Sequence, residues 1–150
     1  MHYLCFKLDQ NRFAIPSKSI DRVFPLLALT EMMQSPSYIA GYFHYQGQFI
    51  VTIDLTQLIN ARKSALLMSS RIVVIEFTAS NERRYKIAIL IEEALETLKI
   101  TEEKWKNNPL ISQQNQIGGK IANINNIAIQ QILLDKLFSE DVLALIHEFN

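Results

Sequence analysis

The chain has little cysteine, little glycine and no charge excess of either sign. Its 150 residues include one cysteine, Cys5, so no disulfide forms within the chain, which is typical of a reducing compartment. Only four glycines occur, and no Gly-x-Gly-x-x-Gly or Walker-type loop is present to hold a phosphate. Lysine plus arginine equals aspartate plus glutamate at 15 each. Nucleic acid is therefore not expected as a partner, because no net field attracts a polyanion.

The chain also lacks a long hydrophobic run. No stretch approaches the roughly 20 apolar residues of a membrane span, and the N-terminus lacks the basic start and apolar stretch of a secretory signal. We therefore expect a cytoplasmic protein without direct membrane insertion. A chain of this length buries roughly 70% of its unfolded surface, so we expect residues 1–150 to form a single domain.

No group of residues has the spacing of a catalytic or metal site. The three histidines, His2, His44 and His147, are far apart and have no metal-ligand neighbours. Asp54 and Glu92 are the candidate paired carboxylates, but a capping role for Asp54 and a strand-end role for Glu92 are favoured. The sequence therefore predicts a non-enzymatic protein without a cofactor or metal.

The most informative stretch is a predicted β-hairpin in the first half of the chain. Residues Tyr42–Tyr45 and Phe49–Ile53 are aromatic and β-branched, and Gly47 lies between them where a tight reversal needs a glycine. Asp54 follows the second strand, and apolar residues at helical spacing over 55–59 come next. We expect Asp54 to cap a short helical turn.

Three further hairpins are predicted from alternating apolar runs that are separated by polar turn residues. They pair Tyr3–Leu8 with Phe13–Ile15, Arg71–Phe77 with Tyr85–Ile91, and Ile117–Ile124 with Ile127–Leu134. Asn125 and Asn126 suit the last turn, since asparagine tolerates positive φ.

Two helices are expected outside these hairpins. Between Pro16 and Pro25, apolar residues recur at three- and four-residue intervals, which predicts a short amphipathic helix over Ser17–Phe24. At the C-terminus, Ser139 is a suitable cap. The apolar stripe of this terminal helix consists of Val142, Leu145, Ile146 and Phe149.

The central stretch resembles the CheW family of bacterial chemotaxis coupling proteins. Residues that match the family pattern without a gap are Pro36, Ile39, Gly41, Gly47, Asp54 and Leu55. The chain also departs from the pattern: His44 stands where the family usually has asparagine, and Gln46 where it usually has arginine. A proline common in the family is absent at Val51-Thr52.

This resemblance, which covers nearly the whole chain, implies an all-β fold. In that family two small five-stranded β-barrels lie side by side, share a hydrophobic seam and are closed by a C-terminal helix. The polar segment Asn60–Ser70 would be the crossover between the two barrels. Residues Glu92–Lys104 have good helix propensity, but the resemblance favours a strand plus a loop. Trp105 would then anchor that loop rather than stack on a ligand.

The resemblance also implies a function. Family members are adaptors that bridge the cytoplasmic tip of a methyl-accepting chemoreceptor and a CheA-type histidine kinase. The receptor-groove and kinase-contact positions match Ile20, Arg22, His44, Gln46 and Gly47, whereas Pro36, Gly41 and Asp54 match structural positions. Glutamine lacks the charge and the forked donors of arginine. An alternative is therefore a divergent CheW-like module that binds a kinase or another regulator without coupling a receptor.

Overall fold

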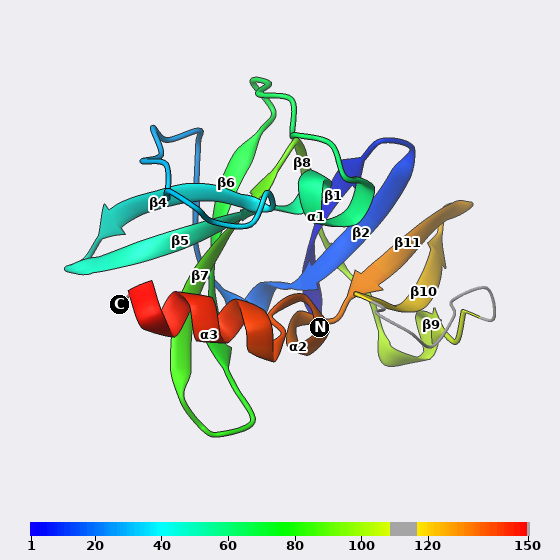
Figure 1. The fold of residues 1–150 in the computed structure, drawn as a ribbon. Helices are drawn as coiled ribbons and strands as arrows, with labels where there is room; N and C mark the ends of the chain where they lie inside the picture. Colours follow the sequence, from blue (N-terminus) through cyan, green and yellow to red (C-terminus); the bar gives the residue numbers. More distant parts are fainter. Residues whose placement is uncertain (109–116, 150) are drawn as a thin grey trace.

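Two β-sheets make up most of the molecule (Figure 1). The computed structural model describes residues 1–108 and 117–149. The six-stranded sheet contains, in spatial order, β8 (Glu93–Lys99), β1 (His2–Leu8), β2 (Asn11–Pro16), β11 (Ile127–Ile132), β10 (Gly118–Ile124) and β9 (Trp105–Lys106). The five-stranded sheet contains, in spatial order, β3 (Ile20–Phe24), β6 (Arg71–Thr78), β7 (Arg84–Ile91), β5 (Gln48–Asp54) and β4 (Ile39–Tyr45).

All four predicted hairpins are present. The pairs β1–β2, β4–β5, β6–β7 and β10–β11 are antiparallel. Gln46 and Gly47 have φ values of 50° and 77°, and Asn125 and Asn126 have values of 53° and 64°. Both two-residue turns therefore have the positive φ at two central positions that matches strand twist. Parallel pairings, β5 with β7 and β11 with β2, join the hairpins into sheets.

The expectation of two five-stranded barrels is wrong in detail, because both sheets are open and one of them has six strands. In the five-stranded sheet, Pro25 follows β3 and cannot donate to a ladder. The segment after it makes a single bridge to β4, in which Thr30 and Tyr42 exchange two backbone hydrogen bonds of 2.9 Å. This single bridge does not join the two edge strands, β3 and β4, into a closed barrel.

The predicted helix over Ser17–Phe24 is also wrong. A 3₁₀ turn, η1, spans Ser17–Ser19, and the rest of the segment is the edge strand β3. A register shift between Ile20 and Arg22 interrupts the two-residue alternation of side chains that a regular strand has. The apolar residues of β3 are therefore three and four positions apart, which is also the spacing of a helix. Pairing with β6 outweighs the weak propensity of so short a segment.

Several strands, among them β1 and β7, are buried on both faces, and their alternate residues belong to different hydrophobic cores. In β1, Leu4, Phe6 and Leu8 enter a large shared core between the two sheets, whereas Tyr3 and Cys5 enter a smaller core with Ala14 and Trp105. In β7, residues of the shared core likewise alternate with Ala88 and Leu90, which belong to a third core. Two-sided burial explains why these strands are nearly continuous apolar runs.

Three α-helices complete the part of the chain that the structure describes. Helix α1 (Leu55–Asn60) starts at Asp54, whose Oδ1 accepts a hydrogen bond from the Gln57 amide at 3.2 Å, as predicted for a cap. After α2 (Leu134–Leu137), helix α3 (Glu140–Phe149) runs across the front of the molecule (Figure 1). Val142 and Ile146 of α3 are buried in the shared core. The apolar stripe of the terminal helix is confirmed at these two positions.

The region after β7 follows the family resemblance rather than helix propensity. Strand β8 pairs with β1, and a 3₁₀ turn, η2 (Glu102–Lys104), leads to Trp105. Trp105 is buried, and its ring packs edge-on against Tyr3 with centroids 5.2 Å apart. It therefore anchors the segment, as predicted. Residues 109–116, which come next in the sequence, lie outside the described residues.

Replacing Gly41 with alanine should destabilise the fold. Gly41 has a φ of 148°, and an added Cβ would lie 2.6 Å from the Thr30 carbonyl oxygen and 3.0 Å from the Leu29 Cβ. We expect a loss of about 2 to 4 kcal/mol in the free energy of unfolding, measured in urea, because backbone must move. Gly47→Asn is the control, since no atom lies within 4 Å of a Cβ there. Equal losses in both variants would contradict this account of Gly41.

Candidate protein-interaction site

The turn of the central hairpin lies beside a cation from another strand. Gln46 Oε1 accepts a hydrogen bond from Lys86 Nζ at 3.3 Å, and Lys86 lies on β7. The same ammonium group lies 3.6 Å from Asp21 Oδ2, next to the shift in β3. Strands β3 and β7 therefore place charged groups beside the β4–β5 turn.

Tyr45 is the centre of an aromatic and cationic cluster at this end of the sheet. The guanidinium carbon of Arg22 lies 5.9 Å from the Tyr45 ring centroid, and Lys86 Nζ lies 5.8 Å from it. Phe24 packs edge-on against Tyr45 at 5.3 Å and against Phe43 at 5.9 Å. Cations held on aromatic faces interact favourably with the rings. We call Arg22, Phe24, Tyr45, Gln46 and Lys86 the hairpin cluster.

The structure brings two of the five predicted contact residues into one cluster. Arg22 and Gln46 both belong to the hairpin cluster, and Gly47 completes the adjoining turn. His44 is paired with Phe49 across the hairpin, and their rings are 5.3 Å apart. Ile20 is half-buried and packs against the shared core rather than standing on a helix. Ile20 and His44 therefore lie outside the hairpin cluster.

Sequence reasoning missed Lys86, Phe24 and Tyr45 as members of this cluster. Lys86 is remote in the chain from residue 46, and only the parallel pairing of β5 with β7 brings the two strands together. The aromatic residues had a usable signal, since Tyr45 directly precedes the turn. The sequence pattern predicted the hairpin, but it did not predict that β7 lies beside it.

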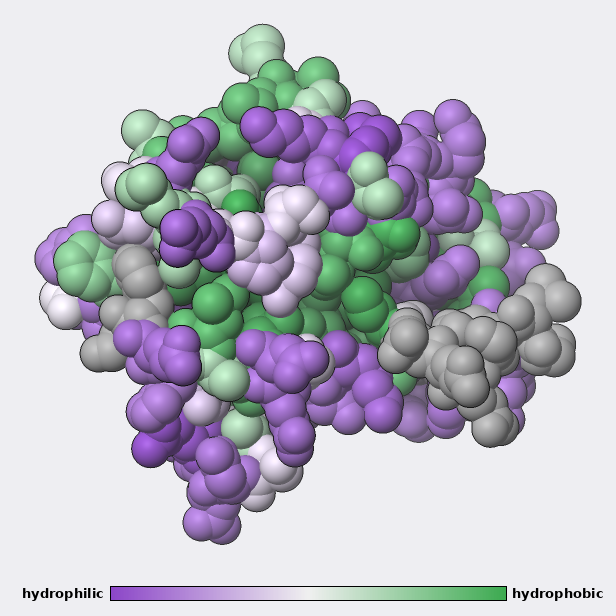
Figure 2. Space-filling view, in the orientation of Figure 1, coloured by the Kyte–Doolittle hydropathy of each residue, from purple (hydrophilic) through white to green (hydrophobic). Residues whose placement is uncertain are grey.

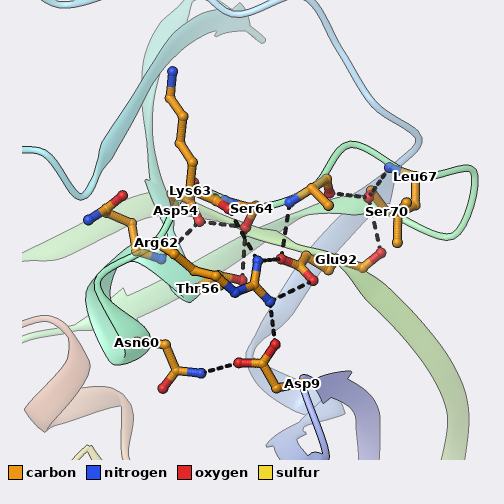
Figure 3. A network of polar contacts seen from close by, with 12 residues as sticks. Asp9, Asp54, Thr56, Asn60, Arg62, Lys63, Ser64, Leu67, Ser70 and Glu92 are labelled. Atoms are coloured by element: carbon orange, nitrogen blue, oxygen red, sulfur yellow. Dashed lines mark hydrogen bonds and ion pairs between the residues drawn. The ribbon is translucent and has the colours of Figure 1, made fainter.

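A polar network joins the two sheets at the crossover (Figure 3). Arg62, in the segment after α1, forms an ion pair with Asp9 in the β1–β2 turn. Both of its terminal nitrogens donate to Glu92, with an Nη1–Oε1 distance of 2.6 Å and an Nη2–Oε2 distance of 3.3 Å. Asn60 also donates to Asp9. Arg62 thus connects a turn of the six-stranded sheet with the link between β7 and β8.

The network favours the charged forms of its members. The hydrogen bond from Arg62 lowers the pKa of Asp9 below its usual value of 3.8. Burial raises the pKa of Glu92, but hydrogen bonds from Arg62 and the Ala65 amide outweigh burial and lower that pKa below 4.5. Both carboxylates are therefore structural partners of Arg62, which agrees with the role that the sequence favoured for Glu92.

Asp54 has a second structural role in the same region. Beyond capping α1, it accepts hydrogen bonds from the Ser64 amide at 2.9 Å and from the Ser64 hydroxyl at 2.5 Å. The same hydroxyl lies 2.9 Å from Thr56 Oγ1 (Figure 3). Asp54 therefore fixes both the start of α1 and the chain that leaves it.

Among residues 1–108 and 117–149, no three His, Cys, Asp or Glu side chains are grouped so that they could hold a metal ion. No helix in this part of the chain is long and apolar enough to cross a membrane.

Removing the Arg62 guanidinium should reduce the acid sensitivity of the fold. Folding lowers the pKa of Asp9 below 3.8 and the pKa of Glu92 below 4.5. The stabilisation from each carboxylate is therefore fully present above its usual pKa, and it is lost as the pH falls below that value and through the lowered pKa of the folded state. We expect Arg62→Gln to have a lower Tm than the wild type at pH 7 and a smaller loss of Tm between pH 7 and pH 3. Calorimetry measures both, with Lys120→Gln as a control. Parallel Tm curves for wild type and Arg62→Gln would contradict the linkage.

Both the sequence and the fold are similar to those of known proteins. The family model of the CheW-like domain matches residues 2–140. Among solved structures, the chain is similar to the scaffolding protein TtCheW from Thermoanaerobacter tengcongensis, with a TM-score of 0.79 and 20% sequence identity. The match covers 94% of this chain and 89% of the other.

At that level of identity, the similarity to the solved structure shows a shared fold. A search of curated proteins finds no significant match. The family model extends from the first strand to the start of the terminal helix and includes both sheets, the crossover and the hairpin cluster. The chain therefore belongs to the CheW-like domain family.

Proposed function

We propose that this protein is a non-enzymatic adaptor that couples a methyl-accepting chemoreceptor to a CheA-type histidine kinase, in chemotaxis or in type IV pilus motility signalling. The observation that carries the proposal is the family match over residues 2–140. Such an adaptor acts in the cytoplasm and joins membrane receptors without entering the bilayer. Its mechanism is simultaneous binding, which needs two separate surfaces on one rigid body.

A hydrophobic band supports one of these surfaces. Figure 2 shows hydrophobic residues across the middle of the molecule, between the level of α1 and the level of α3 in Figure 1. Leu58 and Ile59 of α1, Leu134 of α2 and Leu143 of α3 are only partly buried while they pack against the shared core. A hydrophobic surface of this kind is suited to the apolar face of a helix. We assign it to the helical receptor tip.

The hairpin cluster supports the second contact. Gln46 itself carries no charge, but Lys86 Nζ lies 3.3 Å from it and Arg22 shares the Tyr45 ring. A cationic group is therefore present beside position 46, although it comes from β7. Aromatic residues and arginine are frequent anchors of protein interfaces. The cluster is suited to a partner surface that carries a carboxylate.

One observation favours the alternative of a CheW-like module that binds a kinase or another regulator without receptor coupling. Lys86 is already engaged by Asp21 at 3.6 Å, so part of its charge is compensated within the chain. A weakened cation beside position 46 would impair one contact and leave the other intact. The two functions are distinguished by whether one partner or two partners bind.

Titration against the CheA-type kinase and a receptor-tip fragment from the same cell tests the proposal. We expect each partner to bind alone and a ternary complex to form, measured by calorimetry and by sedimentation of the mixture. Binding of the kinase alone would replace the proposal with the alternative. Binding of neither partner would contradict both functions. Turnover of a nucleotide or phosphodonor by the purified protein would contradict the non-enzymatic role.

Charge reversal in the hairpin cluster should weaken binding without unfolding the protein. Arg22 is exposed, so we expect Arg22→Glu to keep the wild-type Tm and to raise the Kd for one partner about tenfold or more. Lys120→Glu, an exposed change on the other sheet, is the control. In contrast, Ile20→Glu should lower the Tm, because Ile20 packs against the shared core. An unchanged Kd for both partners with Arg22→Glu would exclude the cluster as a contact.

A further inference from the structure

The loop between α1 and β6 ends in a row of exposed hydrophobic side chains. Leu66, Leu67 and Met68 have exposed fractions of 68%, 44% and 98%. This loop projects from the body at the top of Figure 1, and Figure 2 shows hydrophobic surface at the same place. We call these three residues the apolar tip. None of them belongs to the hydrophobic cores of the described residues.

The backbone of the apolar tip is held in position. The Leu67 amide donates to Ser70 Oγ at 2.8 Å, and Ser70 Oγ in turn donates to the Glu92 carbonyl at 3.0 Å. The Arg71 guanidinium donates to the Met68 carbonyl at 2.7 Å. These bonds tie the loop to β6 and to the link before β8. A loop that is already ordered pays a smaller entropic cost when it docks.

A pocket of about 570 Å³ lies directly beside the apolar tip. It is lined mainly by hydrophobic residues of the connection between β3 and β4, with Ile72 and Leu90 of the five-stranded sheet. Leu66 belongs to both the tip and the pocket wall. The volume is within the range of ligand pockets, which are also mainly apolar. An apolar projection and an apolar hollow are therefore neighbours on one surface.

The pocket wall also carries charges of both signs. Glu31, Lys63 and Asp54 line it, and the Asp54 carboxylate is held within the chain by Ser64. Within the described residues, neither the Glu31 carboxylate nor the Lys63 ammonium has a hydrogen bond or an ion pair. Figure 3 shows the Lys63 side chain extended away from the Arg62 network. Two opposite charges at one pocket are thus available to an incoming partner.

We propose that the apolar tip and the pocket form a self-complementary surface through which two copies of this chain make a two-fold symmetric dimer. Each tip enters the pocket of the other copy, and Lys63 of each copy faces Glu31 of the partner subunit. A two-fold interface uses the same patch twice, so that patch must contain both halves of every contact. This surface contains both the apolar tip and the pocket, and both Lys63 and Glu31.

Charge over the whole chain also favours this occupant. The 15 basic and 15 acidic residues give a formal net charge of zero at pH 7, so two copies do not repel each other at long range. The surface contains none of Arg22, Gln46 and Lys86. Dimerisation therefore leaves the hairpin cluster open, and the proposal does not depend on the adaptor function.

Sedimentation velocity of the full chain between about 1 μM and about 1 mM tests the dimer, a range that spans weak to moderate affinities. We expect the average mass to rise with concentration from 17.3 kDa to twice that value and then to stop. Met68→Ser should raise the dimer Kd about tenfold or more. Because Met68 is 98% exposed, this variant should keep the wild-type circular dichroism and Tm. Ile127→Ser, an exposed change on the other sheet, is the control.

A charge exchange tests the two-fold pairing itself. Lys63→Glu and Glu31→Lys should each weaken the dimer, and the double variant Lys63→Glu/Glu31→Lys should restore it, since every cross-subunit pair is then opposite in sign again. A mass of 17.3 kDa throughout the concentration range would overturn the proposal. Growth beyond a dimer would also overturn it, because it indicates a head-to-tail contact. A dimer whose Kd does not change with Met68→Ser would overturn the proposal as well. A folded monomer that binds another protein through the apolar tip would also overturn it.

Discussion

Hydrophobic contact between the two sheets is the constraint on which the rest of the molecule depends. Phe6 and Ile15 of one sheet and Ile53, Ile75 and Ile89 of the other lie in one shared core and are almost fully buried. Because the opposite faces of the same strands fill two smaller cores, the strands tolerate few polar residues. The two sheets are therefore fixed relative to each other. An adaptor needs this rigidity, since it must present its contact surfaces in a constant geometry.

Polar contacts then fix the chain where it crosses between β5 and β6. Arg62 binds Asp9 and Glu92, while Asp54 holds both the start of α1 and Ser64. These bonds position the crossover segment, and Ser70 extends the same order to the projecting loop. The carboxylates that looked most like catalytic candidates are thus used to fix the backbone. What remains open to partners is a hydrophobic band, a cationic and aromatic cluster and an apolar tip.

Much of the fold could be predicted because local sequence signals agree with the final structure. The hairpin turn at Gln46-Gly47 and the cap at Asp54 depend on neighbouring residues only. Strand β3 was missed because a register shift gave it a helical spacing, and its state depends on pairing with β6 far along the chain. Lys86 was missed for a similar reason, since a parallel pairing places β7 beside the hairpin. Sequence patterns therefore predicted the individual hairpins. They did not predict how the hairpins are arranged next to one another in the two sheets.

Hydrogen exchange of the protein with the CheA-type kinase, with the receptor-tip fragment and with both tests the central claim most directly. Exchange reports protection of backbone amides along the chain. We expect the two partners to slow exchange in different segments, one at the hydrophobic band near α1 and α3 and one at the hairpin cluster. Both segments should be protected at once in the mixture. Protection of the same amides by both partners, with one displacing the other, would contradict an adaptor that couples them.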